Sequence, residues 1–144
     1  MIATEKRRKA AQLLLDFYKG RITNDQMDDA WPRDAEDIGL TKIHRATWGL
    51  YSDFQEEYIE GKLRKKYITA KAIHRCLVFL KSGLEYEWIG FGMSKSLVPH
   101  ILELFDSHRR EINRAGDQSV WPFYRKADYK YAWKHATLIP LCLM

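Results

Sequence analysis

The sequence predicts an all-α fold: a compact, single-domain bundle of about five or six helices. First, apolar residues recur at helical spacing in several separate stretches of the chain. Second, most of these stretches end at a glycine or at a Trp-Pro pair, both of which stop helices. Third, a chain of 144 residues with 46% apolar composition is long enough to bury one core. We therefore expect residues 1–144 to form one domain.

The first helix is predicted at residues 5–19, with Thr4 as candidate N-cap and Gly20 as the stop. One face carries its apolar side chains, which are Ala10, Leu13, Leu14 and Phe17. Residues 6–9 are all basic and lie at the positive end of the helix dipole, where cations are mildly unfavourable. We expect this end of the helix to be solvated or frayed.

Two more helices are predicted before the middle of the chain. A short helix at 23–30 ends at Trp31-Pro32, and an acidic connector follows at 34–37. A long amphipathic helix is predicted at 40–60. Its helical stripe consists of Leu40, Ile43, Thr47, Leu50 and Phe54.

The element around which the others are expected to pack is a helix between Thr69 and Gly83. Its apolar side chains are Ile73, Cys76, Leu77 and Leu80, widened by Ala72, Val78 and Phe79. A helix that is apolar on most sides has to be central. Thr69 has the hydroxyl of an N-cap, and Gly83 can adopt the left-handed conformation that closes a helix.

Beyond the central helix, residues 84–88 alternate apolar and acidic side chains, which predicts a short extended segment. Helices are predicted at 96–115 and 127–135, and an aromatic turn at 121–124 lies between them. The apolar tail at 137–144 either lies across the core or meets a partner, because an exposed apolar tail would promote aggregation.

Established catalytic signatures are missing from the sequence. It contains no phosphate-binding glycine loop, paired-cysteine zinc motif, H-E-x-x-H motif or serine elbow. His100 and Glu103 would share a helix face, but the other ligands of a di-iron bundle are missing. We therefore expect no enzyme activity, no catalytic residue, no metal site and no cofactor.

Charge is segregated along the chain, although the net charge is a moderate +5. Residues 25–37 hold six acids and one base, whereas residues 62–75 hold six bases and no acid. Either a partner with complementary patches binds this dipolar surface, or the two stretches pair with each other inside the fold.

These observations favour a non-catalytic protein-binding module. Aromatic residues make up 13% of the chain, and tryptophan and tyrosine often anchor a partner at an interface. The candidate partner-binding strip is Glu85, Tyr86, Glu87 and Trp88, with the aromatic rings packed onto the central helix and the two acids facing outward.

The alternative function is nucleic-acid binding through a basic patch at 62–75. Its candidate phosphate contacts are Lys62, Arg64, Lys65 and Lys66. Further candidate contacts are Arg125, Lys126, Lys130 and Lys134. The sequence shows none of the helix-turn-helix, zinc-finger or RNA-binding aromatic signatures. Nucleic acid is therefore the less favoured partner.

The expected compartment is the cytoplasm. Two cysteines, Cys76 and Cys142, do not make the disulfide framework of a small secreted protein. The N-terminal apolar run is too short for a signal peptide, and no stretch is long enough to span a bilayer. We expect no association with membranes.

Three short motifs carry a resemblance to a group of proteins. They are Gly-Arg-Ile-Thr-Asn at 20–24, Leu-Glu-Tyr-Glu-Trp at 84–88 and Trp-Pro-Phe at 121–123. With them, the chain resembles small, uncharacterised bacterial helical proteins. In size and composition it is also similar to immunity proteins of bacterial toxin systems. This resemblance implies an inhibitor that masks the active site of a toxin.

Overall fold

The protein is all-α throughout the part of the chain that the computed structural model describes, which is residues 1–51, 54–88 and 115–135. The helices are α1 (Thr4–Tyr18), α2 (Asn24–Ala30), α3 (Ile38–Thr47), α4 (Gly61–Lys65), α5 (Tyr67–Ser82) and α7 (Lys126–His135). Short 3-10 turns occupy Trp48–Leu50 and Gln118–Val120. No strand occurs within these residues, so the predicted fold class is confirmed. The helix predicted at 96–115 lies almost wholly outside them.

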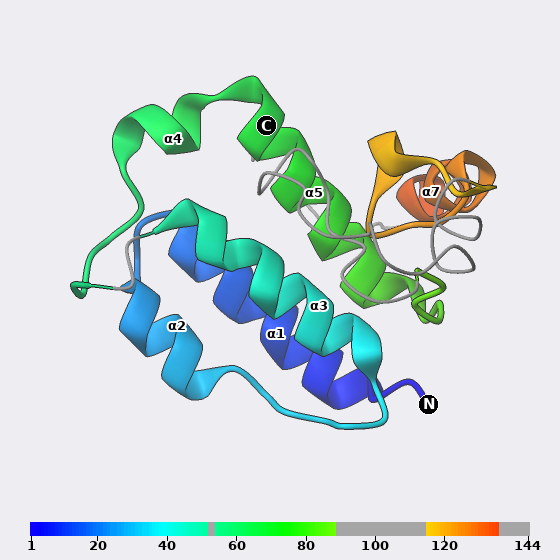
Figure 1. Cartoon of the computed structure of the whole chain (residues 1–144), viewed down its shortest axis with the longest axis horizontal. Coiled ribbons are helices and arrows are strands. Elements are labelled where there is room, and N and C mark those ends of the chain that lie inside the picture. The colour runs from blue at the N-terminus through cyan, green and yellow to red at the C-terminus, as the bar shows by residue number, and fades with distance from the viewer. Residues whose placement is uncertain (52–53, 89–114, 136–144) are drawn as a thin grey trace, which may run out of the picture.

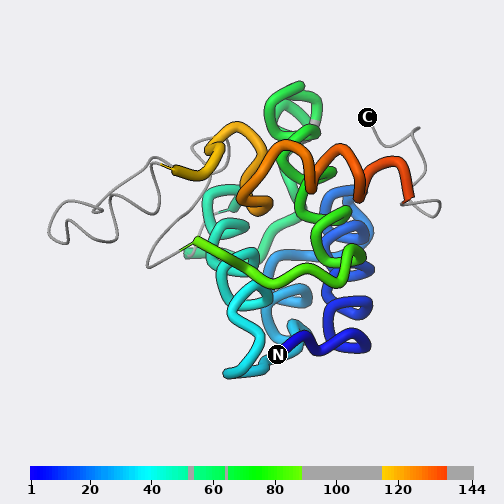
Figure 2. Tube along the Cα trace, turned by 90° about the vertical axis from the view of Figure 1, so that its right-hand side faces the viewer, coloured from blue at the N-terminus to red at the C-terminus, as the bar shows by residue number. Residues whose placement is uncertain are grey.

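Helix α5 is the central element, as predicted. Helix α1 packs along it, and α3, α4 and α7 also contact it. Figure 1 shows α1, α2 and α3 grouped with similarly inclined axes, and α7 on the far side of α5 from α2. In Figure 2 the N-terminus lies near the bottom of the view, and α7 crosses the upper part of the molecule above it.

The interior of α5 is completely buried, from Ala72 to Leu80. Gly83 ends the helix with a φ of 72°, the left-handed conformation predicted for it. The predicted start is wrong by a few residues, because α5 begins at Tyr67. Thr69 is buried inside the helix and is therefore no N-cap.

The long helix predicted at 40–60 is wrong. Helix α3 ends at Thr47 and a 3-10 turn follows at Trp48–Leu50, while residues 54–60 form no helix. Asn24 explains the change, because it forms two hydrogen bonds with this stretch. Its backbone N–H donates to Glu57 O (2.9 Å), and its Oδ1 accepts from Glu57 N–H (2.6 Å). Backbone groups satisfied in this way are not available to a helix. Phe54, the last residue of the predicted stripe, is 98% exposed.

The solvated N-terminus predicted for the first helix is confirmed for Lys6, Arg8 and Lys9, which are exposed, but is wrong for Arg7, which is 1% exposed. Its Nε and Nη2 donate to the two oxygens of Asp37 at 2.7 and 2.9 Å. Its Nη1 donates to the backbone oxygen of Leu84 at 2.7 Å. The guanidinium also lies 5.0 Å from the ring centre of Phe79. One side chain thus joins α1, the start of α3 and the segment after α5.

The partner carboxylate, Asp37, is 1% exposed. Burial acts to raise its pKa, but hydrogen bonds from Arg7 and from the backbone N–H of Ala3 outweigh this effect. The net result is a pKa below the usual value of an aspartate, so the carboxylate is charged at neutral pH.

An aromatic cluster holds the segment that follows α5. The indole N–H of Trp121 donates to the hydroxyl of Tyr86 at 2.9 Å, and that of Trp88 donates to Phe123 O at 3.2 Å. Gly116 lies against the same rings, because a Cβ added there would come within 2.5 Å of Trp88 and 2.6 Å of Tyr124. The predicted aromatic turn is therefore part of the core.

We predict that Arg7→Met lowers the free energy of unfolding by about 3–5 kcal/mol, because it leaves the Asp37 carboxylate buried and unpaired. The double variant Arg7→Met/Asp37→Leu should recover part of the loss, since no charge is then left buried. Urea unfolding measures both. Arg8→Met, at an exposed neighbouring position, should stay within about 0.5 kcal/mol of the wild type. An equal loss in the Arg7 and Arg8 variants would contradict the assignment.

Candidate functional site

A cavity of about 310 Å³ opens beside α2 and is the candidate functional site, which we call the acidic–aromatic cleft. It is lined by Asn24, Asp25, Asp28, Trp48 and Tyr51. The first three side chains come from α2, and the two rings come from the 3-10 turn after α3 and the residue that follows it. Carboxylates therefore face aromatic rings across the cleft.

The acidic side of the cleft is positioned by the N-terminus of α2. Thr23 and Gln26 form a capping box: the hydroxyl of Thr23 accepts from Gln26 N–H at 3.2 Å, and the Gln26 side chain accepts from Thr23 N–H at 2.9 Å. Asp25 and Asp28 are three residues apart in the helix that this cap starts. Side chains at this spacing share a helix face, which places both carboxylates at the cleft.

The aromatic side is held by contacts to the core. Tyr51 packs edge-on against the buried ring of Phe17, with 5.8 Å between ring centres. Trp48 packs edge-on against His44 at 6.1 Å and leaves 48% of its surface exposed. The indole is thus anchored on one side and open to solvent on the other.

A buried histidine lies behind the cleft. His44 is 8% exposed and stacks on Trp31, with ring centres 5.1 Å apart. Its Nε2 lies 2.6 Å from Oδ1 of Asp28. Burial lowers the pKa of His44, as do Arg33 and Arg45, and this outweighs the opposite effect of Asp28. At neutral pH the ring is therefore uncharged, and the negative charge of Asp28 is not cancelled.

Asp25 is the uncompensated acid of the cleft. Burial raises its pKa, and the nearby carboxylates of Glu56, Asp29 and Asp28 raise it further. Within the described part of the chain its carboxylate has no hydrogen-bond or ion-pair partner. The cleft is therefore a place of concentrated negative potential beside an exposed aromatic face, and both features attract cations.

The predicted partner-binding strip is divided between core and surface. Trp88 is 3% exposed and Tyr86 is half-buried, so both rings pack inward as expected. Glu87 is exposed and pairs with Arg125 at 2.7 Å, whereas Glu85 is exposed and lies 3.6 Å from the N-terminal amine. Only the two acids are presented to a partner, and a partner role for the strip stays a prediction.

The predicted basic patch lies on α4 and at the start of α5. Lys62, Lys65 and Lys66 are exposed, and Arg64 lies in α4. Within the described residues these lysines form no ion pair with the acids at 25–37. Two of those acids pair with α1 instead, in the ion pairs Lys6–Asp34 and Arg7–Asp37.

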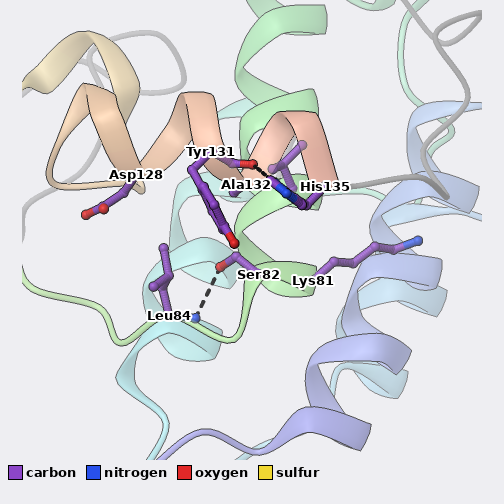
Figure 3. Close-up of a pocket in the computed structure, with 8 residues that line it drawn as sticks. Lys81, Ser82, Leu84, Asp128, Tyr131, Ala132 and His135 are labelled. Carbon is purple, nitrogen blue, oxygen red and sulfur yellow. Dashed lines mark hydrogen bonds between the residues drawn. The ribbon is translucent and has the colours of Figure 1, made fainter.

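A second cavity of about 160 Å³ lies where the C-terminal end of α5 meets α7. Its residues are Val78, Lys81, Ser82, Leu84, Asp128, Tyr131, Ala132 and His135. Figure 3 shows the Tyr131 ring reaching toward Ser82, while Lys81 and Asp128 extend away from the cavity. Its charged groups do not converge, so the acidic–aromatic cleft is the better candidate for a binding site.

Comparisons with protein-family models, curated proteins and solved structures find no match to this chain. Among the residues that the structure describes, no group of three or more histidine, cysteine or acidic side chains is arranged to hold a metal ion. The same part of the chain contains no helix long and apolar enough to cross a membrane.

We predict that the free energy of unfolding decreases as the pH is lowered from about 7 to about 5. Burial is the main reason that His44 and His74 both have pKa values in the folded protein below the usual value of a histidine. The unfolded chain takes up these protons at a higher pH than the folded chain. The stabilisation that comes from the two uncharged rings is therefore complete above the histidine pKa of the unfolded chain. It is lost as the pH falls through the lower pKa values of the folded protein. Urea unfolding at several pH values measures this decrease.

The variant His44→Gln should show a shallower decrease over the same pH range, because only the contribution of His74 remains. Glutamine is uncharged at both ends of the range, so its own effect on stability does not depend on pH. A pH dependence identical to that of the wild type would show that the buried ring of His44 does not resist protonation.

Proposed function

We propose that this protein is a non-catalytic protein-binding module whose partner docks a basic segment on the acidic–aromatic cleft. The observation that carries the proposal is the exposed indole of Trp48 next to the unpaired carboxylate of Asp25. Exposed tryptophans are frequent anchors at interfaces, and opposite charge on the partner speeds and orients its docking.

The exposed acids Glu85 and Glu87 follow α5 in the chain and form a second candidate contact region, although each also faces a cation of the protein itself. The finer form of the proposal is an immunity-type inhibitor, in which the partner is a bacterial toxin and docking masks its active site. The size and composition of the chain support this form.

We predict that Trp48→Ala weakens binding of the partner by at least about tenfold, as loss of an aromatic anchor does at other interfaces. The wild-type protein, used as bait in an extract of the native host, identifies the partner, and titration of the purified components measures the affinities. Trp133→Ala is the matched control, because Trp133 is 44% exposed but lies on α7, outside the cleft. It should bind like the wild type.

Failure to recover any stable partner, or equal weakening by both tryptophan variants, would refute docking at the cleft. The same partner tests the immunity-type form. It should be toxic when expressed alone and harmless when expressed together with the wild-type protein. A partner that is harmless on its own removes the immunity role and leaves the binding proposal in place.

A second candidate function, nucleic-acid binding, has one specific observation in its favour. Next to the basic patch, Tyr67 is 71% exposed and Ile68 is 55% exposed. Lys71 Nζ lies 4.6 Å from the centre of the Tyr67 ring. An exposed ring among lysines is the arrangement on which single-stranded bases stack while the cations contact phosphates.

We predict for this candidate that Lys62→Gln/Lys65→Gln weakens binding to mixed single-stranded DNA and RNA and lowers the salt dependence by about one to two counterions. Filter binding across a salt series measures both quantities. Lys9→Gln/Lys81→Gln removes the same charge from exposed positions of α1 and α5 outside the basic patch and should change neither. The absence of salt-sensitive micromolar binding by the wild type would remove the candidate.

A further inference from the structure

We propose that the acidic–aromatic cleft receives the side chain of an arginine from the partner, with the guanidinium stacked on Trp48 and paired with Asp25. This inference rests on the proposed function and names the chemical group that the cleft recognises. Three observations carry it: the accessible charges of the cleft, the flat aromatic side, and the lack, in the described part of the chain, of a base that pairs with Asp25.

The accessible charges are those of Asp25 and Asp28. Asp25 has no partner among the described residues, and the side chain of Asp28 is 42% exposed although its Oδ1 lies against His44. Asn24 contributes no such group, because its Oδ1 accepts from Glu57 N–H and its Nδ2 donates to Gln55 O at 3.0 Å. The ligand of the cleft must therefore be a hydrogen-bond donor that carries positive charge.

The aromatic side favours a flat cation. Trp48 offers an open indole, and the ring of Tyr51 lies next to it in the cavity lining. A guanidinium is planar and weakly hydrated, so it stacks on an aromatic ring while its donors remain in plane to bind a carboxylate with two parallel hydrogen bonds. A lysine ammonium is a compact, strongly hydrated charge that cannot do both. The cavity, at about 310 Å³, has room for the longer side chain.

Among the described residues, no base of the protein itself forms an ion pair with Asp25. Helix α1 forms ion pairs with Asp34 and Asp37, which lie later in the same acidic stretch at 25–37. Neither ion pair involves a residue that lines the cleft. Asp25 is therefore open to pairing with a cation from outside, and a partner arginine supplies one.

The test is a nuclear magnetic resonance titration of the ¹⁵N-labelled full chain. The probes are three short peptides, acetyl-Gly-X-Gly-amide, in which X is arginine, lysine or citrulline. Citrulline has the shape of arginine without the charge. The signal followed is the indole N–H of Trp48, assigned by its disappearance in Trp48→Phe. We expect the arginine peptide to bind at least about threefold more tightly than the lysine peptide, as the stacking contribution requires, and the citrulline peptide not to bind measurably.

Two aspartate variants separate specific pairing from general attraction. Asp25→Asn should weaken binding of the arginine peptide by at least about fivefold, because the carboxylate of the pair is lost. Asp29→Asn removes the same charge from the same helix, but Asp29 does not line the cavity, so this variant should lose less than about twofold. The ¹⁵N spectra of both variants show whether the fold is kept.

The inference is overturned if the arginine and citrulline peptides bind equally, if lysine binds as tightly as arginine, if the two aspartate variants lose equal affinity, or if no peptide shifts the Trp48 signal. None of these outcomes overturns the proposed function. That proposal fails separately, when no protein partner of the cleft is found. A partner whose binding depends on Trp48 but not on Asp25 would keep the proposed function and refute recognition of arginine.

Discussion

The buried ion pair between Arg7 and Asp37 is the interaction on which the arrangement of the first half of the chain depends. It links three segments that are distant in sequence, because the same guanidinium reaches Asp37 and the backbone oxygen of Leu84. The charges have no access to water, so the pair is stable only when all the hydrogen bonds form together. Gly39 lies against this pair: a Cβ there would be 3.0 Å from Phe79 and 3.2 Å from Arg7. A side chain at this position would displace Phe79 or Arg7 by a few tenths of an ångström, so the close approach of α3 to α5 favours glycine.

The same ion pair shapes the charge of the molecular surface. Helix α1 neutralises Asp34 and Asp37, the acids at the end of the acidic stretch. In the described part of the chain, the acids at its start are not neutralised by a base. Asp25 has no partner among the described residues, and Asp28 faces a neutral histidine. The acidic stretch at 25–37 thus contains acids that the fold pairs with bases and acids that remain accessible. Asp25 and Asp28 remain able to attract a cation.

Much of the helical framework could be predicted, because its signals are local. The apolar run from Ala72 to Leu80 and the glycine that follows it identify α5, and Trp31-Pro32 ends α2 where expected. Arg7 could not be predicted, because a buried arginine and a solvated one have the same helical spacing. What distinguishes them is Asp37, thirty residues away along the chain. Spacing within one helix carries no information about such a partner.

The cleft could not be predicted from the sequence for a related reason. In a continuous helix at 40–60, Trp48 and Tyr51 would lie beside the buried stripe and would belong to the core. The structure ends that helix at Thr47, where a threonine and then Gly49 weaken helix formation and Asn24 offers hydrogen bonds to the chain further on. The helical periodicity at 40–60 therefore predicts the wrong structure, because it carries no information about the competing hydrogen bonds that α2 supplies. The end of α3 leaves the ring of Trp48 48% exposed, whereas Tyr51 still packs on Phe17. The Asn24–Glu57 pairing holds the chain beyond them beside α2. The termination of one helix by a residue of another is thus what creates the cleft.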